Sequence, residues 1–334
     1  MKKIVLKRLG ILTLVAILLL IVPGSAIAAD ENGQPQTEAT TGSESTKYFD
    51  EGPVFPAIER ALAQEGPVKD DLINRGLFIL PTSDGKGGEI PGEIKIGEIE
   101  KLINAGTYSI DETNTLVQGS QSPEQKSATS ASLSYKYALM VTRLWGIIDQ
   151  FSYRGHSAYV TIPANITLSP DTVHNLYTNH MGLPNGSFIE SGVGWVSWAS
   201  SPIIYTYSSY TGAWSYIPIT SGISRDIYLQ LFVNPTTYLA YMYVVDMYTL
   251  SFVMTTQTVS GLNHRVDQCQ EECSSGTWTA TPQVLQYNNQ LVNTSNQWVN
   301  WNNSIPTAWT SNSPLHQNYG IQNDMKWINT WCTP

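Results

Sequence analysis

The stretch that decides the fold class is IYLQLFVNPTTYLAYMYVV, residues 227–245. Apolar and aromatic side chains fill both sets of alternate positions on either side of a turn at residues 234–237. A period of two residues is typical of a β-strand, and the sequence Asn-Pro-Thr-Thr favours a turn. The stretch therefore predicts a β-hairpin with apolar residues on both faces, lying centrally in a layered sheet.

Similar short segments occur before and after this hairpin. The predicted strands span residues 138–145, 157–162, 172–179, 188–195, 203–207 and 214–219, and a further strand begins at Leu250. No helical pattern separates them over about 125 residues. Short strands that follow one another without helices predict a mainly β chain, an antiparallel β-sandwich with a small helical N-terminal region.

The first 29 residues predict export. Four basic residues precede or begin an apolar stretch that continues over residues 11–22, and Ala26-Ile27-Ala28 is a small-residue cleavage site. This is the pattern of a secretory signal peptide at residues 1–29. We therefore expect a secreted protein, extracellular or associated with the cell envelope, with no membrane segment after signal cleavage.

The region after the signal changes in composition twice. Residues 30–52 are rich in Thr, Ser, Glu and Gly, and such a segment is expected to be disordered. Residues 53–130 carry short helical patterns, including one at residues 93–104, and end in a polar linker. We interpret residues 53–130 as an accessory region or pro-region; equally, they form an extension packed on the main domain.

The remaining chain is divided into two parts. The β-sandwich domain is predicted for residues 131–262. Residues 263–334 are rich in Trp and Asn, and we expect them to form a C-terminal extension packed on the sandwich. Within it, apolar residues at every seventh position of residues 281–299 favour a helix.

The charge balance excludes two classes of partner. Without residues 1–29 and their four basic side chains, the net charge moves from −9 to −13. Nucleic acids and anionic membranes carry the same sign of charge, so neither is expected as a partner. The part of the chain after residue 130 is poor in charge and uses hydroxyl, amide and aromatic side chains for its polar surface, which is typical of extracellular β folds.

Three cysteines allow a covalent link. Cys269, Cys273 and Cys332 predict one disulfide and one thiol in an exported chain, and the three possible pairs stay open. A bridge to Cys332 would close a loop of about 60 residues and contribute roughly 4 kcal/mol. The alternative is a metal site with His264 as a fourth ligand, but the spacing matches no common zinc pattern. We expect neither a metal nor a cofactor.

Glu190 is the candidate for acid–base chemistry. It is the only acidic residue between Asp171 and Asp226. Alternation places it on one strand face with Gly192 and Gly194, which predicts open space of the kind a ligand groove needs. A lone carboxyl among aromatic residues can have a raised pKa and act as an acid or a base; the alternative is a solvated or hydrogen-bonded carboxyl at a sheet edge.

Aromatic residues gather close to Glu190 in the sequence. Trp195, Trp198, Tyr207 and Trp214 lie within residues 195–214. Exposed flat rings stack on sugar faces, whereas buried rings contribute apolar area to a core. These four residues and Glu190 are the predicted ligand-binding set, and core packing is the alternative for each ring.

The segment Glu190-Ser-Gly-Val-Gly-Trp195, followed by Trp214-Ser-Tyr216 and a strand-turn-strand, resembles the YrpD-like family of secreted bacterial proteins over roughly residues 157–259. That resemblance implies a secreted lectin-like sandwich. The layout is also similar to that of the glutamic peptidases, which share this fold type and use a Gln and a Glu on one sheet. Glu190 stands in the place of their Gln. Their second motif, a Glu inside Trp-Tyr-Glu-Trp-Tyr-Pro, is absent, and Tyr205-Thr206-Tyr207 stands there instead.

These observations lead to one main hypothesis and two alternatives. The main hypothesis is a secreted, non-catalytic β-sandwich of the concanavalin-like jelly-roll type that binds a glycan or another cell-envelope polymer. Its contact would lie near Glu190 and the four aromatic residues. One alternative is a secreted hydrolase, glutamic peptidase-like or glycosidase-like, that uses Glu190. The other is an extracellular structural or assembly protein.

Overall fold

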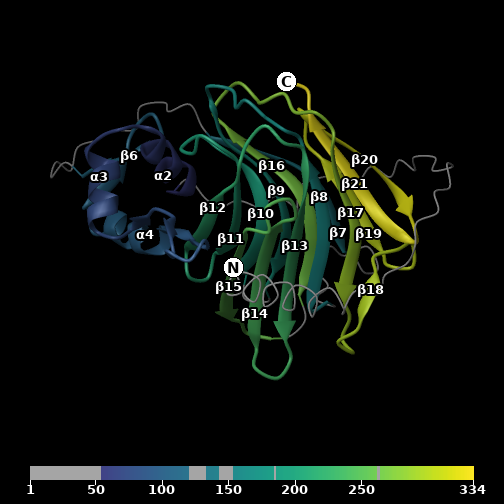
Figure 1. The fold of residues 1–334 in the computed structure, drawn as a ribbon. Coiled ribbons are helices and arrows are strands. Elements are labelled where there is room, and N and C mark those ends of the chain that lie inside the picture. Colours follow the sequence, from purple (N-terminus) through teal and green to yellow (C-terminus); the bar gives the residue numbers. More distant parts are fainter. Residues whose placement is uncertain (1–53, 120–132, 143–152, 184–185, 262–263) are drawn as a thin grey trace.

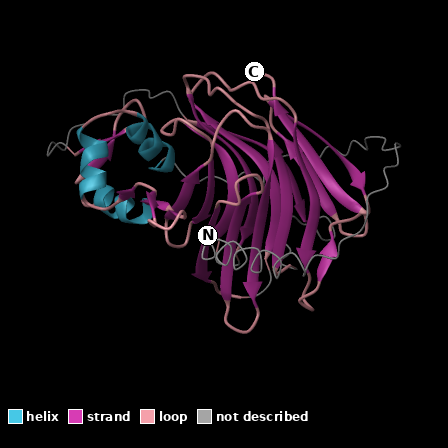
Figure 2. Cartoon of the chain, in the orientation of Figure 1, coloured by secondary structure: helices cyan, strands magenta, loops and turns pink. Residues whose placement is uncertain are grey.

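The computed structural model describes residues 54–119, 133–142, 153–183, 186–261 and 264–334, so the predicted signal peptide and the segment 30–52 lie outside the described residues. The chain forms a mainly β fold with a small helical N-terminal segment, as predicted. Its helices are α2 (Val54–Ala63), α3 (Pro67–Asn74) and α4 (Ile96–Asn104). They lie together at one side of a β-sandwich (Figures 1 and 2). Within the described residues, none of these helices has the length and apolar character needed to cross a membrane.

Two antiparallel sheets form the sandwich. The nine-stranded sheet has the order β1 (Phe78–Ile79), β4 (Gly92–Lys95), β12 (Ala213–Pro218), β11 (Ile203–Ser208), β10 (Phe188–Val196), β9 (Thr172–Gly182), β16 (Arg265–Ser274), β7 (Ser134–Thr142), β19 (Thr307–Ser311). The eight-stranded sheet has the order β15 (Phe252–Thr258), β14 (Leu239–Asp246), β13 (Arg225–Asn234), β8 (Gly155–Ile162), β17 (Val284–Val292), β21 (Met325–Cys332), β20 (Leu315–Gln322), with β18 (Trp298–Asn300) beside β17. Two small pairs complete the fold: β2 (Thr82–Ser83) with β3 (Glu89–Ile90), and β5 (Tyr108–Ile110) with β6 (Leu116–Gln118).

The strands predicted from alternation are present. The six upstream segments form β7 to β12, and the stretch at residues 227–245 forms the hairpin β13–β14. Its turn is held by the side-chain oxygen of Asn234, which accepts hydrogen bonds from the backbone amides of Thr236 at 2.9 Å and Thr237 at 3.2 Å. The hairpin is not central, however, because only the edge strand β15 lies beyond β14.

The C-terminal region is part of the sandwich itself. The prediction that residues 263–334 form an extension packed on a finished sandwich is wrong, because β16 lies inside the nine-stranded sheet between β9 and β7. The predicted helix is wrong too: residues 284–292 form β17, which pairs with β8. The seven-residue spacing of apolar side chains suits a helix, but tertiary packing in the sheet decides the outcome.

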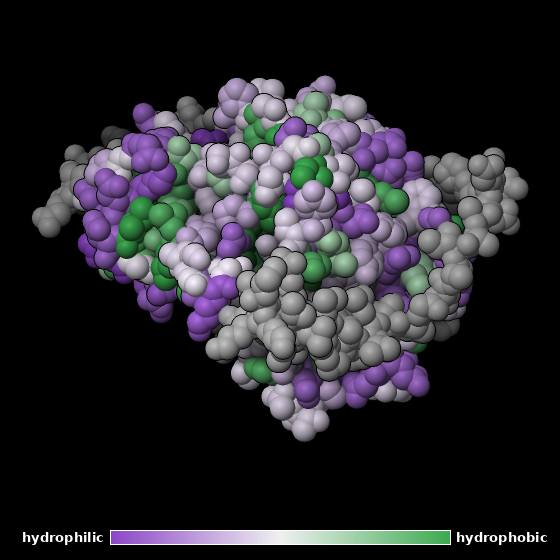
Figure 3. Space-filling model, viewed as in Figure 1, coloured by the Kyte–Doolittle hydropathy of each residue, from purple (hydrophilic) through white to green (hydrophobic). Residues whose placement is uncertain are grey.

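The N-terminal unit, residues 54–118, packs directly on the nine-stranded sheet. Strand β4 extends that sheet by pairing with β12, and the predicted linker contains β5 and β6. Phe55, Ile58 and Leu62 of α2 share one apolar cluster with Trp214 of β12. The unit also exposes the apolar side chains of Ile73, Ile79, Leu80 and Ile90. Figure 3 shows hydrophobic surface on this side of the molecule.

Candidate active site

Glu190 lies on the face of the nine-stranded sheet that α2 covers. Alternation along β10 places Phe188 and Val196 on the same face, and both belong to the apolar cluster that contains Phe55 of α2. Ile189, between them, packs toward the eight-stranded sheet. Glu190 therefore points into the layer between the sheet and the N-terminal unit, and not into the core of the sandwich.

The two neighbouring strands bring more titratable residues to this face. Glu190 pairs with His180 of β9, and His180 pairs with Asp267 of β16. Directly paired residues of antiparallel strands share a face, so the three side chains form a row across the sheet. Nδ1 of His180 lies 3.0 Å from Oδ2 of Asp267, and Nε of the buried Arg265 donates to the same oxygen at 3.3 Å.

A second group forms around His174 of β9. Its Nδ1 lies 2.6 Å from Oε2 of Glu59 on α2, and its Nε2 lies 3.0 Å from Oε1 of Glu271 on β16. All three side chains are buried. Burial alone would lower the pKa of His174, but Glu59 and Glu271 outweigh it and raise the pKa well above the usual 6.5. The raised pKa favours the imidazolium form of His174, in which both ring nitrogens donate hydrogen bonds.

The environment of Glu190 favours its neutral form. Only 3% of the residue is exposed. Burial raises the pKa of Glu190 well above 4.5, and the negative charges of Glu271 and Asp267 add to the effect. The positive charge of His174 and a hydrogen bond from Tyr205 act in the opposite direction and are smaller. Glu190 therefore keeps its proton at pH values where an ordinary glutamate is charged.

The structure brings together four of the five predicted ligand-binding residues. Trp198, Tyr207 and Trp214 lie with Glu190 on the face under α2, and the ring of Phe55 meets Trp214 edge-on at 4.7 Å. Trp195 instead lies in the core between the two sheets. Tyr207 and Trp214 are buried and Trp198 is half-buried, so in this form of the protein the rings pack against the N-terminal unit.

The expected open space beside Glu190 is absent from this face. A Cβ atom at Gly192 would lie 2.6 Å from the ring of Tyr205. A Cβ atom at Gly194 would lie 2.5 Å from both the backbone oxygen of Asn175 and Cδ2 of Leu176. The two glycines therefore leave room for neighbouring side chains and backbone, and the prediction of a groove at these positions is wrong.

The three cysteines do not form the expected link. Cys269 and Cys273 lie four residues apart on the extended strand β16, a separation of about 13 Å, and so cannot bridge to each other. Cys332 is a buried thiol that packs with Ala138, on the other face of the nine-stranded sheet. The alternative metal set with His264 is not assembled either, and within the described ranges no group of His, Cys, Asp and Glu is arranged to hold a metal ion.

Sequence reasoning missed most of the titratable residues of this site. His174 and His180 occupy one face of β9, and the alternation of residues 172–179, which predicted this strand, was the signal that could have paired them. Glu271 stands between the two cysteines of β16, and its local sequence does not distinguish it from the neighbouring Glu272. Glu59 carried no signal, because nothing local distinguishes a buried glutamate on an amphipathic helix from an exposed one.

Comparisons with known proteins find similarity only at the level of the fold. No family model matches the chain, and no curated protein matches it either, so the resemblance to the YrpD-like family stays a prediction. Scytalido-glutamic peptidase with a peptide-based transition-state analogue gives a TM-score of 0.45 at 8% identity and covers 60% of this chain and 100% of its own. SCP-B, an eqolisin peptidase bound to a tripeptide, gives 0.39 at 10% identity, covering 60% and 98%. Basic winged bean lectin gives 0.27 at 9% identity, covering 60% and 93%.

Proposed function

We propose that this protein is a secreted hydrolase in which Glu190 is the general acid and Glu271 is the general base. The observation that carries the proposal is the buried Glu190, whose surroundings raise its pKa, in one layer with a second carboxyl that is hydrogen-bonded to His174. A carboxyl that keeps its proton can act as a general acid, and a second carboxyl in the same layer can act as the base. His174 is a positioning residue, because its Nε2 lies 3.0 Å from Oε1 of Glu271 and orients that carboxyl.

The chemistry fits hydrolysis of an amide bond. The carboxylate of Glu271 would take a proton from a water molecule while the water oxygen bonds to the carbonyl carbon. Glu190 would donate its proton toward the carbonyl oxygen as negative charge develops there. When the C–N bond breaks, the proton held by Glu271 passes to the departing nitrogen. A carboxylic acid and an amine result, and Glu190 regains the proton it lent.

The choice of a peptide substrate rests on what lies over the site. Helix α2 is a peptide segment that covers this face and places a side chain against His174. The resemblance to glutamic peptidases implies a Gln where Glu190 stands. A protonated carboxyl donates a hydrogen bond as an amide does, but only the carboxyl can also give a proton to the substrate. The second carboxyl comes from Glu271 of β16 and not from residues 205–207, where the resemblance places it.

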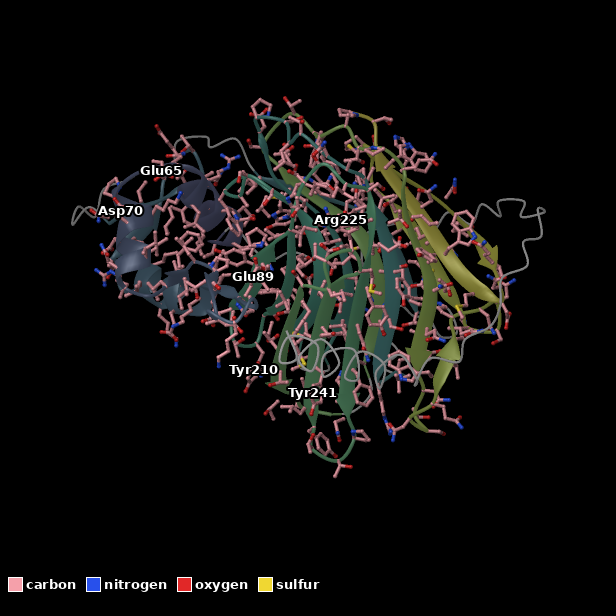
Figure 4. The ribbon with its side chains drawn as sticks, in the orientation of Figure 1. Glu65, Asp70, Glu89, Tyr210, Arg225 and Tyr241 are labelled. Atoms are coloured by element: carbon pink, nitrogen blue, oxygen red, sulfur yellow. The ribbon has the colours of Figure 1, made fainter. Side chains whose placement is uncertain are left out.

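The test compares the full chain with a Phe55→Ala variant, in which α2 packs less tightly on the sheet. Labelled casein and labelled xylan are offered across the acid and neutral pH range. We expect the variant to release casein peptides, and Glu190→Gln or Glu271→Gln in the same background to abolish the release. The exposed Glu65, at the outer side of the N-terminal unit in Figure 4, supplies the matched control Glu65→Gln. Hydrolysis that survives Glu190→Gln, or none by any form, would refute the proposal.

A second candidate function, glycan binding, is favoured by a different surface. Trp327 and Trp331 are half-buried on one face of β21, four residues apart and thus about 13 Å from each other. Gly320 leaves space for the ring of Trp327, and His316 stacks on Trp331 with ring centres 5.6 Å apart. Co-sedimentation with insoluble polysaccharides should show saturable retention that Trp327→Ala and Trp331→Ala reduce and Trp309→Ala, on β19, does not. Equal retention of all three variants would exclude this surface.

A further inference from the structure

Helix α2 carries a charged residue where its apolar face meets the sheet. Phe55, Ile58 and Leu62 are buried, as an amphipathic helix requires, but Glu59 on the same face is also fully buried. Phe55 and Glu59 are four residues apart and so lie one above the other on the helix. A buried carboxyl is costly unless its oxygens are paired, so the location of its partners shows what the helix is bound to.

Among the described residues, both hydrogen-bond partners of the Glu59 carboxyl belong to the sandwich and not to the N-terminal unit. Oε2 lies 2.6 Å from Nδ1 of His174 on β9, and Nε1 of Trp198, after β10, donates to Oε1 at 3.3 Å. Burial raises the pKa of Glu59, and His174 offsets part of that rise. Two donors of the sandwich, His174 and Trp198, therefore converge on the Glu59 carboxyl, which belongs to a helix outside the sheet. This is the geometry of a subsite that binds a carboxyl group.

Two aromatic rings of the nine-stranded sheet lie next to this subsite. The ring of Phe55 stands edge-on to Trp214 at 4.7 Å and is stacked on Tyr207 at 6.1 Å. Together these rings and the subsite contact an aromatic and an acidic side chain from a single turn of α2. Two different side chains of α2 are thus matched by two different features of the sheet.

We infer that His174 and Trp198 form a carboxylate-binding subsite for acidic peptides, and that α2 fills it as a built-in inhibitor of the hydrolase. This inference rests on the proposed function. The subsite selects substrates with a glutamate or aspartate side chain and an aromatic residue nearby. Glu271 and Glu59 contact the two ring nitrogens of the same His174 side chain. A ligand carboxyl in the place of Glu59 would therefore be separated from the proposed base only by that imidazole ring. While α2 is in place, a substrate chain cannot reach that position.

Binding of a free peptide tests the subsite without any need for catalysis. The full chain carrying Phe55→Ala and Glu59→Ala is titrated with a synthetic peptide that copies residues 54–63, and tryptophan fluorescence reports binding. We expect saturable binding that becomes about tenfold to hundredfold weaker when Gln replaces Glu in the peptide, the factor for one charge-assisted hydrogen bond. Phe78→Ala is the matched control, because Phe78 packs on Trp198 in the same apolar cluster but makes no contact with the carboxyl. That variant should not bind the peptide.

Equal binding of the Glu and Gln peptides, or no binding to a folded double variant, would overturn the inference. Hydrogen exchange of the single variant Glu59→Gln decides the question if the double variant does not fold. Amides of α2 should then exchange about tenfold faster while those of α4 keep their rates; unchanged exchange in α2 would count against it. Peptide binding without any casein hydrolysis would leave the subsite standing and remove the proposed function. Casein hydrolysis without peptide binding would leave the proposed function standing and remove the subsite.

Discussion

Replacing Glu190 by glutamine should stabilise the protein relative to the wild type, and the difference in unfolding free energy should grow as the pH rises. Glutamine has nearly the same shape as a protonated glutamate, so the packing against Tyr205 is kept. The wild-type carboxyl has its pKa raised by burial and by Glu271 and Asp267, so the folded state holds a proton that the unfolded state has lost. Stability from such a group is fully present below the unfolded pKa of about 4.5 and is lost as the pH rises toward the folded pKa.

The size of the effect follows from proton linkage. Above about pH 4.5 the wild type loses about 1.4 kcal/mol of unfolding free energy for each pH unit, until the folded pKa is reached. The Gln variant lacks this loss, so its advantage grows by the same amount, or by about 3 °C in melting temperature per pH unit. His156 and His264, whose pKa values burial lowers to about 4, are present in both proteins, and their contributions cancel.

Urea unfolding of both proteins at a series of pH values between about 4 and 8 measures this difference. The exposed Glu98, half of a surface pair with Lys101, gives the control variant Glu98→Gln, which removes one carboxyl without altering the buried layer around Glu190. A flat difference for Glu190→Gln, or one that shrinks as the pH rises, would show that Glu190 is charged in the folded state. The proposed role as a general acid would then lose its basis.

Three other expectations concern the packing and the thiols. Phe55→Ala removes a buried ring that meets Trp214 and should cost about 3–5 kcal/mol, which a lower urea midpoint would show. Arg225→Met removes the only charged partner that the structure gives Asp246 among the described residues, with Nη1 at 2.6 Å, and should cost about 3–5 kcal/mol, measured by thermal unfolding. Arg225 lies near the middle of the sandwich in Figure 4. Burial and then Glu272 raise the pKa of Cys332 to about 12, so its thiol should not react in the native protein, whereas unfolding without reductant should release all three thiols to Ellman's reagent. Two fewer thiols would mean that a disulfide is present.

The alternation of side chains was enough to find the strands but not their order. Each upstream strand carried its own signal, because alternate residues face alternate sides of a sheet. Residues 265–274 have no such contrast: most of them are polar, yet they are buried on both faces. Their position between β9 and β7 depends on partners more than 80 residues away in the chain, which no local pattern encodes.

The same limit explains why the site was found only in part. Glu190 stood out because acidic residues are absent around it, and the aromatic residues stood out through their number. The residues that give Glu190 its character come from elsewhere: His174 and His180 from β9, Glu271 from β16 and Glu59 from α2. Each is unremarkable in its own segment, and only the assembled sheet places them on one face.

The ionisable residues around His174 are buried, and this burial bears on their role. A core made only for stability gains little from buried ionisable groups, because replacing such groups by apolar ones of similar volume is often neutral or stabilising. Here the histidine and the carboxyls lie on the outer face of a sheet whose inner face already packs against a second sheet. That outer face holds its charges together only while α2 supplies Glu59 and an apolar cover. Without the helix, His174, Glu271 and Glu190 would meet solvent as one polar surface bordered by aromatic rings. The arrangement is therefore better explained as a reactive surface under a cover than as a core with misplaced charges.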